Sequence, residues 1–201
     1  MIAIQRINLA KKYIGKTAVN SLNLTIEQGE LFVLLGLNSA GKTTATKVLS
    51  CPIKPTNGDA LILGASIISN PIKVRELINL SPQETAVAPS LTVRENLGFI
   101  ARIHGSDKKR SKQRAEDIIS SFEVSTIAEE KAKDLSGGWQ RRLSIVMAVI
   151  SQPQILFLDE PTLGFDVVAR RELWNAIRRL ESKIAIILNT NYLEEAESLA
   201  D

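Results

Sequence analysis

The chain has 201 residues, enough for one large α/β domain or for a domain with a small subdomain. Hydrophobic residues make up 44% and charged residues 23%, as in ordinary soluble proteins, and a net charge of +3 is too small to indicate nucleic-acid binding. The longest apolar runs, of about five residues, are far shorter than a membrane span, nothing at the start resembles a signal peptide, and the single cysteine, Cys51, excludes an internal disulfide.

Residues 1–30 have the pattern of an antiparallel β-layer. Apolar residues alternate with polar ones over residues 2–9 and again over residues 18–26, which is typical of half-buried strands. Tyr13 falls in the turn between them. One interpretation is that its ring only covers the edge of the sheet.

The next segment carries a phosphate-binding loop. The apolar run Leu31–Leu35 predicts a buried strand, and the residues after it match the P-loop pattern G-x-x-x-x-G-K-[ST] and lead into a helix. In this pattern backbone N–H groups bind phosphate oxygens, the lysine reaches the β- and γ-phosphates, and the threonine ligates Mg²⁺. We therefore predict a phosphate-binding loop made of Gly36, Leu37, Asn38, Ser39, Ala40, Gly41, Lys42, Thr43 and Thr44.

A helical block interrupts the alternation of strands and helices. Short strands are predicted within residues 60–63 and 78–80, and helices extend from Thr92 to about Phe122, with Thr92 and Glu95 forming a capping box. The basic run within residues 108–114 has acidic neighbours on both sides, so we interpret it as a solvated helix face.

The last part of the chain returns to buried strands. Ile155–Leu158 and Ile184–Leu188 are continuous apolar runs that alternate with amphipathic helices, which indicates a parallel sheet covered on both faces. The predicted fold class is therefore α/β, with a P-loop NTPase core, a mostly parallel sheet, an N-terminal antiparallel β-layer and a helical subdomain.

Two carboxylates follow the strand Ile155–Leu158. Asp159 is placed to hold Mg²⁺ beside Thr43, as a Walker B aspartate does. Glu160 is placed to orient and polarise an attacking water.

Over nearly its whole length, the chain resembles the nucleotide-binding domain of an ATP-binding cassette (ABC) transporter. The specific element is Leu135–Arg142, which is similar to the family signature LSGGQ and precedes the Walker B strand. Ser136 and the backbone N–H groups of Gly137 and Gly138 would form an anion site at a helix N-terminus. In the family this site binds the γ-phosphate of ATP held by a partner subunit.

The resemblance implies further roles and partners. Gln83 matches the Q-loop glutamine that contacts Mg²⁺ and water and faces the membrane subunit, Asp166 matches the D-loop aspartate that reaches across a dimer, and Tyr13 matches the aromatic ring that stacks on adenine. The run Ser90–Leu97 resembles exporters whose ATPase pairs with a separate ABC-2-type membrane subunit. The expected setting is the cytoplasmic face of a membrane, with a second ATPase subunit and no nucleic acid.

The implied organisation is a single ABC ATPase domain over residues 1–201. Residues 1–30 form the antiparallel layer, residues 31–82 and 151–201 form the P-loop core, and residues 83–150 contain the Q-loop, the helical subdomain and the signature helix. The family usually continues with further strands, so we expect the native chain to extend past Asp201.

Three departures from the family pattern affect the predicted site. Leu37 and Ser39 replace proline and glycine, and we expect serine to lose the freedom to adopt a positive φ. Trp139 replaces the glutamine of the signature, at a position expected to be tolerant. Asn191 stands where the family has its switch histidine, and its alternative role is to cap the last helix with Glu194.

These observations leave three functions open. The first is the ATPase subunit of a membrane exporter. The second is a soluble ABC ATPase acting on DNA or ribosomes, although this chain has neither a long coiled coil nor a second cassette. The third is a regulatory cassette that binds ATP and hydrolyses it poorly, which the departures at Ser39 and Asn191 would explain.

Overall fold

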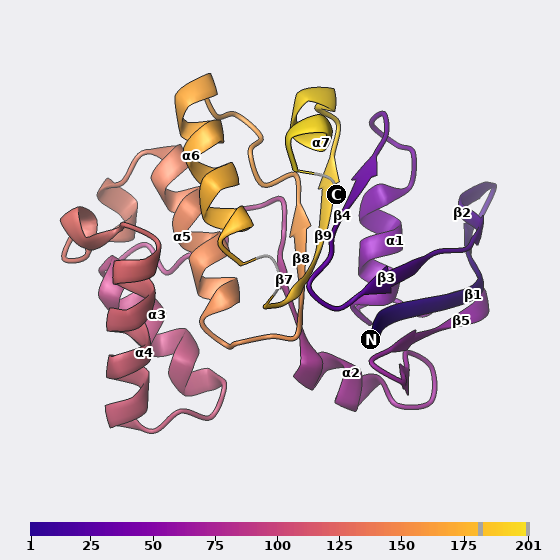
Figure 1. The fold of residues 1–201 in the computed structure, drawn as a ribbon, viewed down its shortest axis with the longest axis horizontal. Coiled ribbons are helices and arrows are strands. Elements are labelled where there is room, and N and C mark those ends of the chain that lie inside the picture. Colours follow the sequence, from indigo (N-terminus) through magenta and orange to yellow (C-terminus); the bar gives the residue numbers. More distant parts are fainter. Residues whose placement is uncertain (181–182, 200–201) are drawn as a thin grey trace.

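Two β-sheets with different strand directions form the framework of the molecule (Figure 1). The structure is a computed structural model that describes residues 1–180 and 183–199, so the predicted continuation past Asp201 lies outside the described residues. The antiparallel sheet contains β1 (Ile2–Tyr13), β2 (Lys16–Leu22), β3 (Thr25–Glu27), β5 (Asn57–Ile62) and β6 (Ala65–Ser66). The parallel sheet has the order β4 (Leu31–Leu35), β9 (Ala185–Thr190), β8 (Ile155–Asp159) and β7 (Ile78–Ser81).

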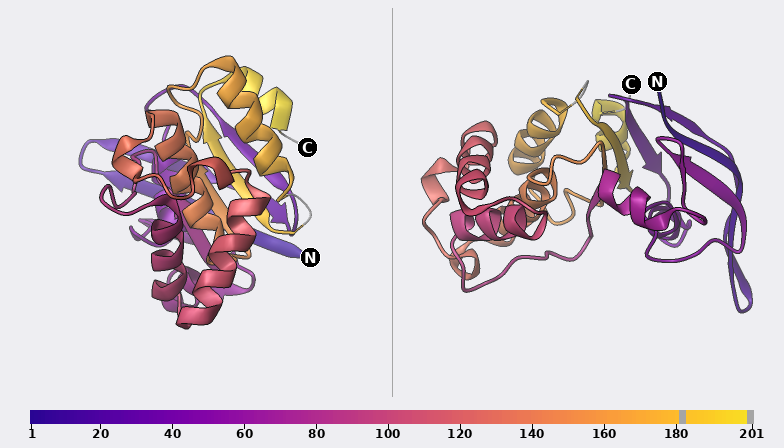
Figure 2. Two further views of the ribbon diagram at one scale, coloured as in Figure 1. Left: turned by 90° about the vertical axis from the view of Figure 1, so that its left-hand side faces the viewer. Right: turned by 90° about the horizontal axis from the view of Figure 1, so that it is seen from below.

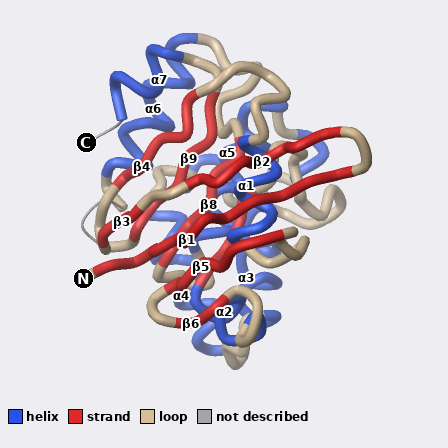
Figure 3. Tube along the Cα trace, turned by 90° about the vertical axis from the view of Figure 1, so that its right-hand side faces the viewer, coloured by secondary structure: helices blue, strands red, loops and turns tan. Residues whose placement is uncertain are grey.

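The antiparallel sheet draws on two separate stretches of the chain. The predicted layer over residues 1–30 is confirmed, but the strand that we assigned to the P-loop core near residues 60–63 is β5, which pairs with β1 (Figure 3). Ile4 of β1 lies between Ile26 of β3 and Ile62 of β5, and all three side chains are fully buried. Lateral pairing therefore places their apolar faces together, which the order of the strands along the chain does not reveal.

The parallel sheet is covered on both faces, as predicted. Every residue of β8 is buried, and successive side chains enter different cores because strand side chains alternate between faces. Phe157 packs in the core shared with α1 (Lys42–Leu49) and the antiparallel sheet, whereas Leu156 and Leu158 pack in the core of the helical side. The right-hand view of Figure 2 shows the helices of residues 93–178 on one side of the parallel sheet and the antiparallel sheet on the other, with α1 between the two sheets.

Seven α-helices lie within the described residues. They are α1 (Lys42–Leu49), α2 (Pro71–Leu77), α3 (Val93–Ile103), α4 (Lys108–Ser121), α5 (Gly137–Val149), α6 (Val167–Arg178) and α7 (Leu193–Leu199), with short 3₁₀ turns at Ser125–Ile127 and Ala132–Asp134. None of these helices is long and apolar enough to cross a membrane.

The predicted helical subdomain is built around α3 and α4. The capping box at the start of α3 is confirmed: Glu95 N–H donates to Thr92 Oγ1 at 3.1 Å, and Thr92 N–H donates to Glu95 Oε2 at 2.8 Å. Buried Asn96 ties the preceding loop to α3, because its amide nitrogen donates to the carbonyls of Ala88, Leu91 and Thr92. The loop that leaves the end of β7 is thereby held to the helical subdomain.

Candidate nucleotide-binding site

The P-loop connects β4 to α1 through two residues with positive φ. Gly41 has a φ of +92°, and a Cβ atom there would lie 2.0 Å from the carbonyl oxygen of Ala18, so only glycine fits this position. Ser39 also has a positive φ, of +68°. Our expectation that serine would avoid this conformation was wrong, and the loop retains its turn at a conformational cost of about 1–2 kcal/mol.

Lys42 is the cation of this loop. Its Nζ donates to the carbonyl oxygens of Gly36 at 2.6 Å and Leu37 at 3.1 Å, and it lies 4.0 Å from Glu160 Oε1. The lysine therefore curls back over the loop toward the end of β8, with its ammonium group close to the predicted position of the phosphates.

A hydroxyl and a carboxylate meet where α1 begins and β8 ends. Thr43 Oγ1 donates to Asp159 Oδ1 at 3.3 Å, although 116 residues separate them in the chain. Buried Asn189 donates to the same oxygen at 3.0 Å and to Thr46 Oγ1 at 2.7 Å, which fixes the orientation of the carboxylate. Sequence reasoning missed Asn189; its place in the strand just before Asn191 was the available signal.

The donor set at this position suits Mg²⁺. Thr43, Gln83 and Asp159 line one cavity of about 360 Å³, and their hydroxyl, amide and carboxylate oxygens are the hard ligands that Mg²⁺ prefers. The described residues contain no group of three His, Cys, Asp or Glu side chains that could hold a metal ion. A cation here would therefore need substrate phosphates and water to complete its coordination, as is usual for Mg²⁺ at phosphate sites.

Glu160 and Asn191 lie next to one another at the carboxyl ends of β8 and β9. The amide of Asn191 is 3.1 Å from both carboxylate oxygens of Glu160, and it donates to them when its nitrogen faces them. The other side of this amide is 3.1 Å from Asn38 Oδ1 in the P-loop. The capping alternative is not what the structure contains, because α7 begins at Leu193 and the Glu194 carboxylate pairs with Arg170 at 3.3 Å.

The P-loop and Glu160 lie on a cavity of about 420 Å³. Its lining includes Tyr13 and Lys16 from the β1–β2 hairpin, most of the P-loop, Gln83 and Glu160. Tyr13 ends β1, one residue before the turn, and is about half exposed at 49%. An aromatic ring at the rim of a phosphate-binding cavity is well placed to stack on a base, although its stacking on adenine stays a prediction.

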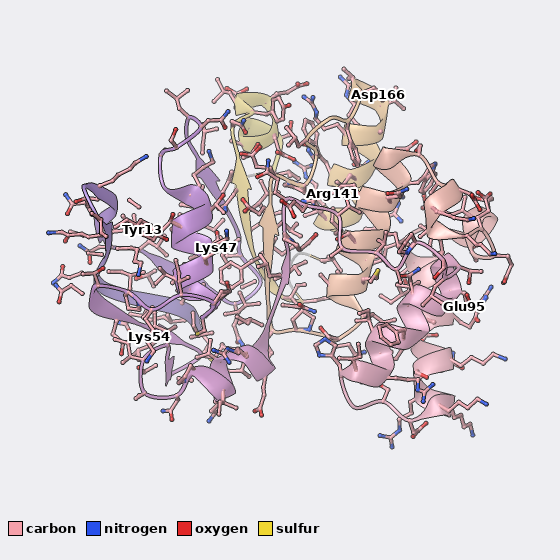
Figure 4. The ribbon with its side chains drawn as sticks, turned by 180° about the vertical axis from the view of Figure 1, so that it is seen from behind. Tyr13, Lys47, Lys54, Glu95, Arg141 and Asp166 are labelled. Atoms are coloured by element: carbon pink, nitrogen blue, oxygen red, sulfur yellow. The ribbon has the colours of Figure 1, made fainter. Side chains whose placement is uncertain are left out.

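The signature residues belong to a second cavity, of about 270 Å³, whose lining contains no P-loop residue. Ser136 caps α5 by accepting from Trp139 N–H at 3.4 Å, and Gly137 and Gly138 are the first residues of that helix. Asp166 caps α6 by accepting from Ala169 N–H at 2.9 Å. Figure 4 shows Asp166 and Tyr13 on opposite sides of the molecule, so one chain does not join its signature site to its own P-loop.

The P-loop, the paired Thr43 and Asp159, and Glu160 together define a P-loop nucleotide-binding site. The chain belongs to the ABC transporter family, whose model matches residues 19–163.

Two curated relatives are similar over nearly all of this chain. The daunorubicin/doxorubicin resistance ATP-binding protein DrrA of Streptomyces peucetius is 36% identical, covering 99% of this chain and 61% of that protein. The doxorubicin resistance ATP-binding protein DrrA of Mycobacterium tuberculosis is 35% identical, covering 97% of this chain and 60% of that protein. The chain thus spans about three fifths of the length of these relatives.

Solved structures have the same fold. An ATP-binding subunit of an ABC transporter superposes with a TM-score of 0.85 at 26% identity, covering 99% of this chain and 83% of that one. CbiO1 of Clostridium perfringens superposes with a TM-score of 0.90 at 24% identity, covering 100% of this chain and 82% of that one. The predicted fold class is confirmed by these structures.

Proposed function

We propose that this chain binds ATP with Mg²⁺, hydrolyses it, and powers a membrane exporter as its ATPase subunit. The observation that carries the proposal is the 3.3 Å contact between Thr43 and Asp159, with Lys42 and Glu160 at the same place. Phosphoryl transfer depends mainly on positioning and on charge stabilisation, and these four side chains supply both. The relatives' names, drug-resistance ATP-binding proteins, support an export role.

Each side chain has a distinct part in the proposed reaction. Loop N–H groups and Lys42 hold the β- and γ-phosphates and stabilise the charge that develops during transfer. Mg²⁺, when bound near Thr43, Gln83 and Asp159, neutralises phosphate charge. Glu160 orients a water molecule and polarises it for attack on the γ-phosphorus, and the bond to the leaving β–γ bridging oxygen breaks to give ADP and phosphate. Asn191, whose amide lies 3.1 Å from both carboxylate oxygens of Glu160, holds this carboxylate in place.

The separation of the two cavities supports a head-to-tail dimer. The signature site is an anion site at a helix N-terminus, but its cavity has no phosphate-binding loop of its own. ATP bound to the P-loop of a second chain would place its γ-phosphate at this site. Asp166 lines the same cavity as the signature residues. The exposed apolar residues Leu163, Val167 and Val168 near it are 43%, 53% and 68% exposed, which favours contact with another protein surface.

We propose that a separate transmembrane subunit contacts the chain through the Q-loop and the helical subdomain. Phe99 and Ile103 are 52% and 62% exposed, and they share one face of α3 because they are four residues apart on it. This arrangement would hold the chain at the cytoplasmic face of the membrane. The basic run at the start of α4 is flanked by Asp107 before it and by Glu116 and Asp117 after it, which gives no support to nucleic-acid binding.

A regulatory cassette with weak hydrolysis is the second candidate, because asparagine replaces histidine at position 191. Steady-state phosphate release with Mg²⁺ and ATP, alongside ATP binding by calorimetry, separates the two. We expect wild-type turnover, and we expect Glu160→Gln, purified identically, to bind ATP without turning it over. Absence of ATP binding would exclude both functions. Binding with equal, residual phosphate release from both proteins would favour the regulatory cassette.

A further inference from the structure

Arg141 belongs to α5 and lies near the centre of the molecule, where its guanidinium reaches the carboxyl ends of β7 and β8 (Figure 4). It is only 4% exposed, and its guanidinium donates to backbone carbonyl oxygens of two separate segments. In the Q-loop it contacts the carbonyls of Pro82 and, at 3.2 Å, Gln83. At the end of β8 it donates to three successive carbonyls, those of Asp159 at 2.7 Å, Glu160 at 3.4 Å and Pro161 at 3.3 Å.

Only arginine has a side chain that can make this set of contacts. Its planar guanidinium presents five N–H donors in a fixed fork, whereas lysine offers a single nitrogen. Burial lowers the pKa of Arg141 to about 10, while the nearby carboxylates of Asp159, Glu160 and Glu195 oppose that shift. The guanidinium therefore stays charged at neutral pH, and charged donors make the stronger hydrogen bonds.

The hydrogen bonds from Arg141 hold the backbone of two residues that line the nucleotide cavity, although Arg141 does not line the cavity itself. Gln83 and Glu160 both line the 420 Å³ cavity, whereas Arg141 does not. Glu160 has a positive φ of +48°, an uncommon conformation for a residue other than glycine. Its N–H donates to the Asn189 carbonyl at 2.9 Å and its carbonyl accepts from Arg141, so its backbone is held from both directions.

We infer that Arg141 is a positioning residue that ties the signature helix to the Q-loop and to Glu160. Because α5 starts at the signature, a shift of this helix is passed through one rigid guanidinium to both Gln83 and Glu160. The inference rests on the proposed hydrolytic function for its catalytic consequence. We call the hydrogen bonds from Arg141 to the Q-loop and to the end of β8 the tether. The tether is a property of the folded chain and can be tested without measuring ATP hydrolysis.

The neighbouring arginine provides a matched control for the tether. Arg142 is also buried on the same helix, but it donates to the Phe122 carbonyl at 3.0 Å and pairs with Glu172 at 3.3 Å, away from the Q-loop. Because Arg142 lines the signature cavity beside Phe165, it is a control for the Q-loop only. A spin label on Thr85→Cys reports Q-loop mobility, because Thr85 is exposed whereas Cys51 is buried. Hydrogen exchange reports the segment 160–165, whose N–H groups of Glu160, Leu163 and Phe165 are hydrogen-bonded.

We expect Arg141→Lys to increase both label mobility and exchange in the segment 160–165, and we expect Arg142→Lys to leave label mobility unchanged. Equal mobility and exchange in wild type and Arg141→Lys would overturn the tether. Equal increases in label mobility in the two lysine variants would also overturn it, because they would indicate general loosening of α5. If the wild-type protein released no phosphate, that result would contradict the proposed function. Label mobility and hydrogen exchange would still show whether Arg141 holds the Q-loop and the segment 160–165.

For catalysis, we expect Arg141→Lys and Arg141→Gln to lower kcat by about ten- to a hundredfold, the usual effect of misplacing catalytic groups by about 1 Å. The dissociation constant for ATP should change little, since Arg141 lies outside the cavity. Retained ATP binding also shows that each variant is folded. Arg114→Gln, which removes contacts with Ser106 and Gln152 far from the site, should keep wild-type turnover. A wild-type kcat in Arg141→Lys would show that charge alone suffices and would refute the role of the fork.

Discussion

Replacing Asn191 by alanine removes the amide that lies 3.1 Å from both carboxylate oxygens of Glu160. A hydrogen bond to a charged group is worth about 1.5–3 kcal/mol, and about 1.4 kcal/mol corresponds to a tenfold change in rate. Asn191 is half-buried, so water can replace part of the contact, and the lower end of this range applies. We therefore expect Asn191→Ala to lower kcat by about tenfold.

The reverse substitution tests whether asparagine limits the reaction. Histidine at position 191 is longer than asparagine and can carry a proton, so it can contact both Glu160 and the γ-phosphate. One preorganised donor of this kind is worth about 10²–10³ in rate. We expect Asn191→His to raise kcat by a smaller factor, because the asparagine amide already supplies the contact with Glu160.

Steady-state phosphate release from wild type and both variants is the assay, with Glu160→Gln as the inactive control. ATP affinity should remain similar throughout, because Asn191 is not in the lining of the 420 Å³ cavity. A wild-type kcat in Asn191→Ala would refute the role of Asn191 in holding Glu160. No gain in Asn191→His, together with rapid wild-type turnover, would mean that this chain organises its γ-phosphate in another way.

Three further outcomes follow from the site. Lys42→Ala should weaken ATP binding by roughly 1.5–3 kcal/mol, through loss of a charge-assisted contact; calorimetry checks this, and an unchanged affinity would contradict the P-loop assignment. Glu160→Gln should accumulate as an ATP-bound dimer, and light scattering that finds only monomer at saturating ATP would argue against the head-to-tail arrangement. Gly41→Ala should destabilise the fold by about 1–3 kcal/mol, because the added Cβ would lie 2.0 Å from the Ala18 carbonyl oxygen; an unaltered thermal melting temperature would show that the hairpin yields.

Short-range patterns in the sequence were sufficient for much of this protein. The P-loop, the signature segment and the capping box of Thr92 and Glu95 each depend on residues within about two helical turns of one another, and local backbone geometry determines what such patterns form. The buried strands of the parallel sheet were also evident, because strands covered on both faces are apolar throughout. The resemblance to ABC transporters followed from these local motifs and their order.

Long-range contacts were decided only by the tertiary structure. The pairing of β5 with β1 depends on lateral register, which strand order along the chain does not specify. Ser39 adopts a positive φ although serine does not favour it, because the loop around it is held at both ends by β4 and α1. Arg141 and Asn189 have no local pattern that sets them apart, since an arginine on a helix is ordinarily a surface residue and a strand asparagine has many uses. Their roles arise only because the sheet brings carbonyls and carboxylates from distant segments within hydrogen-bonding distance of them.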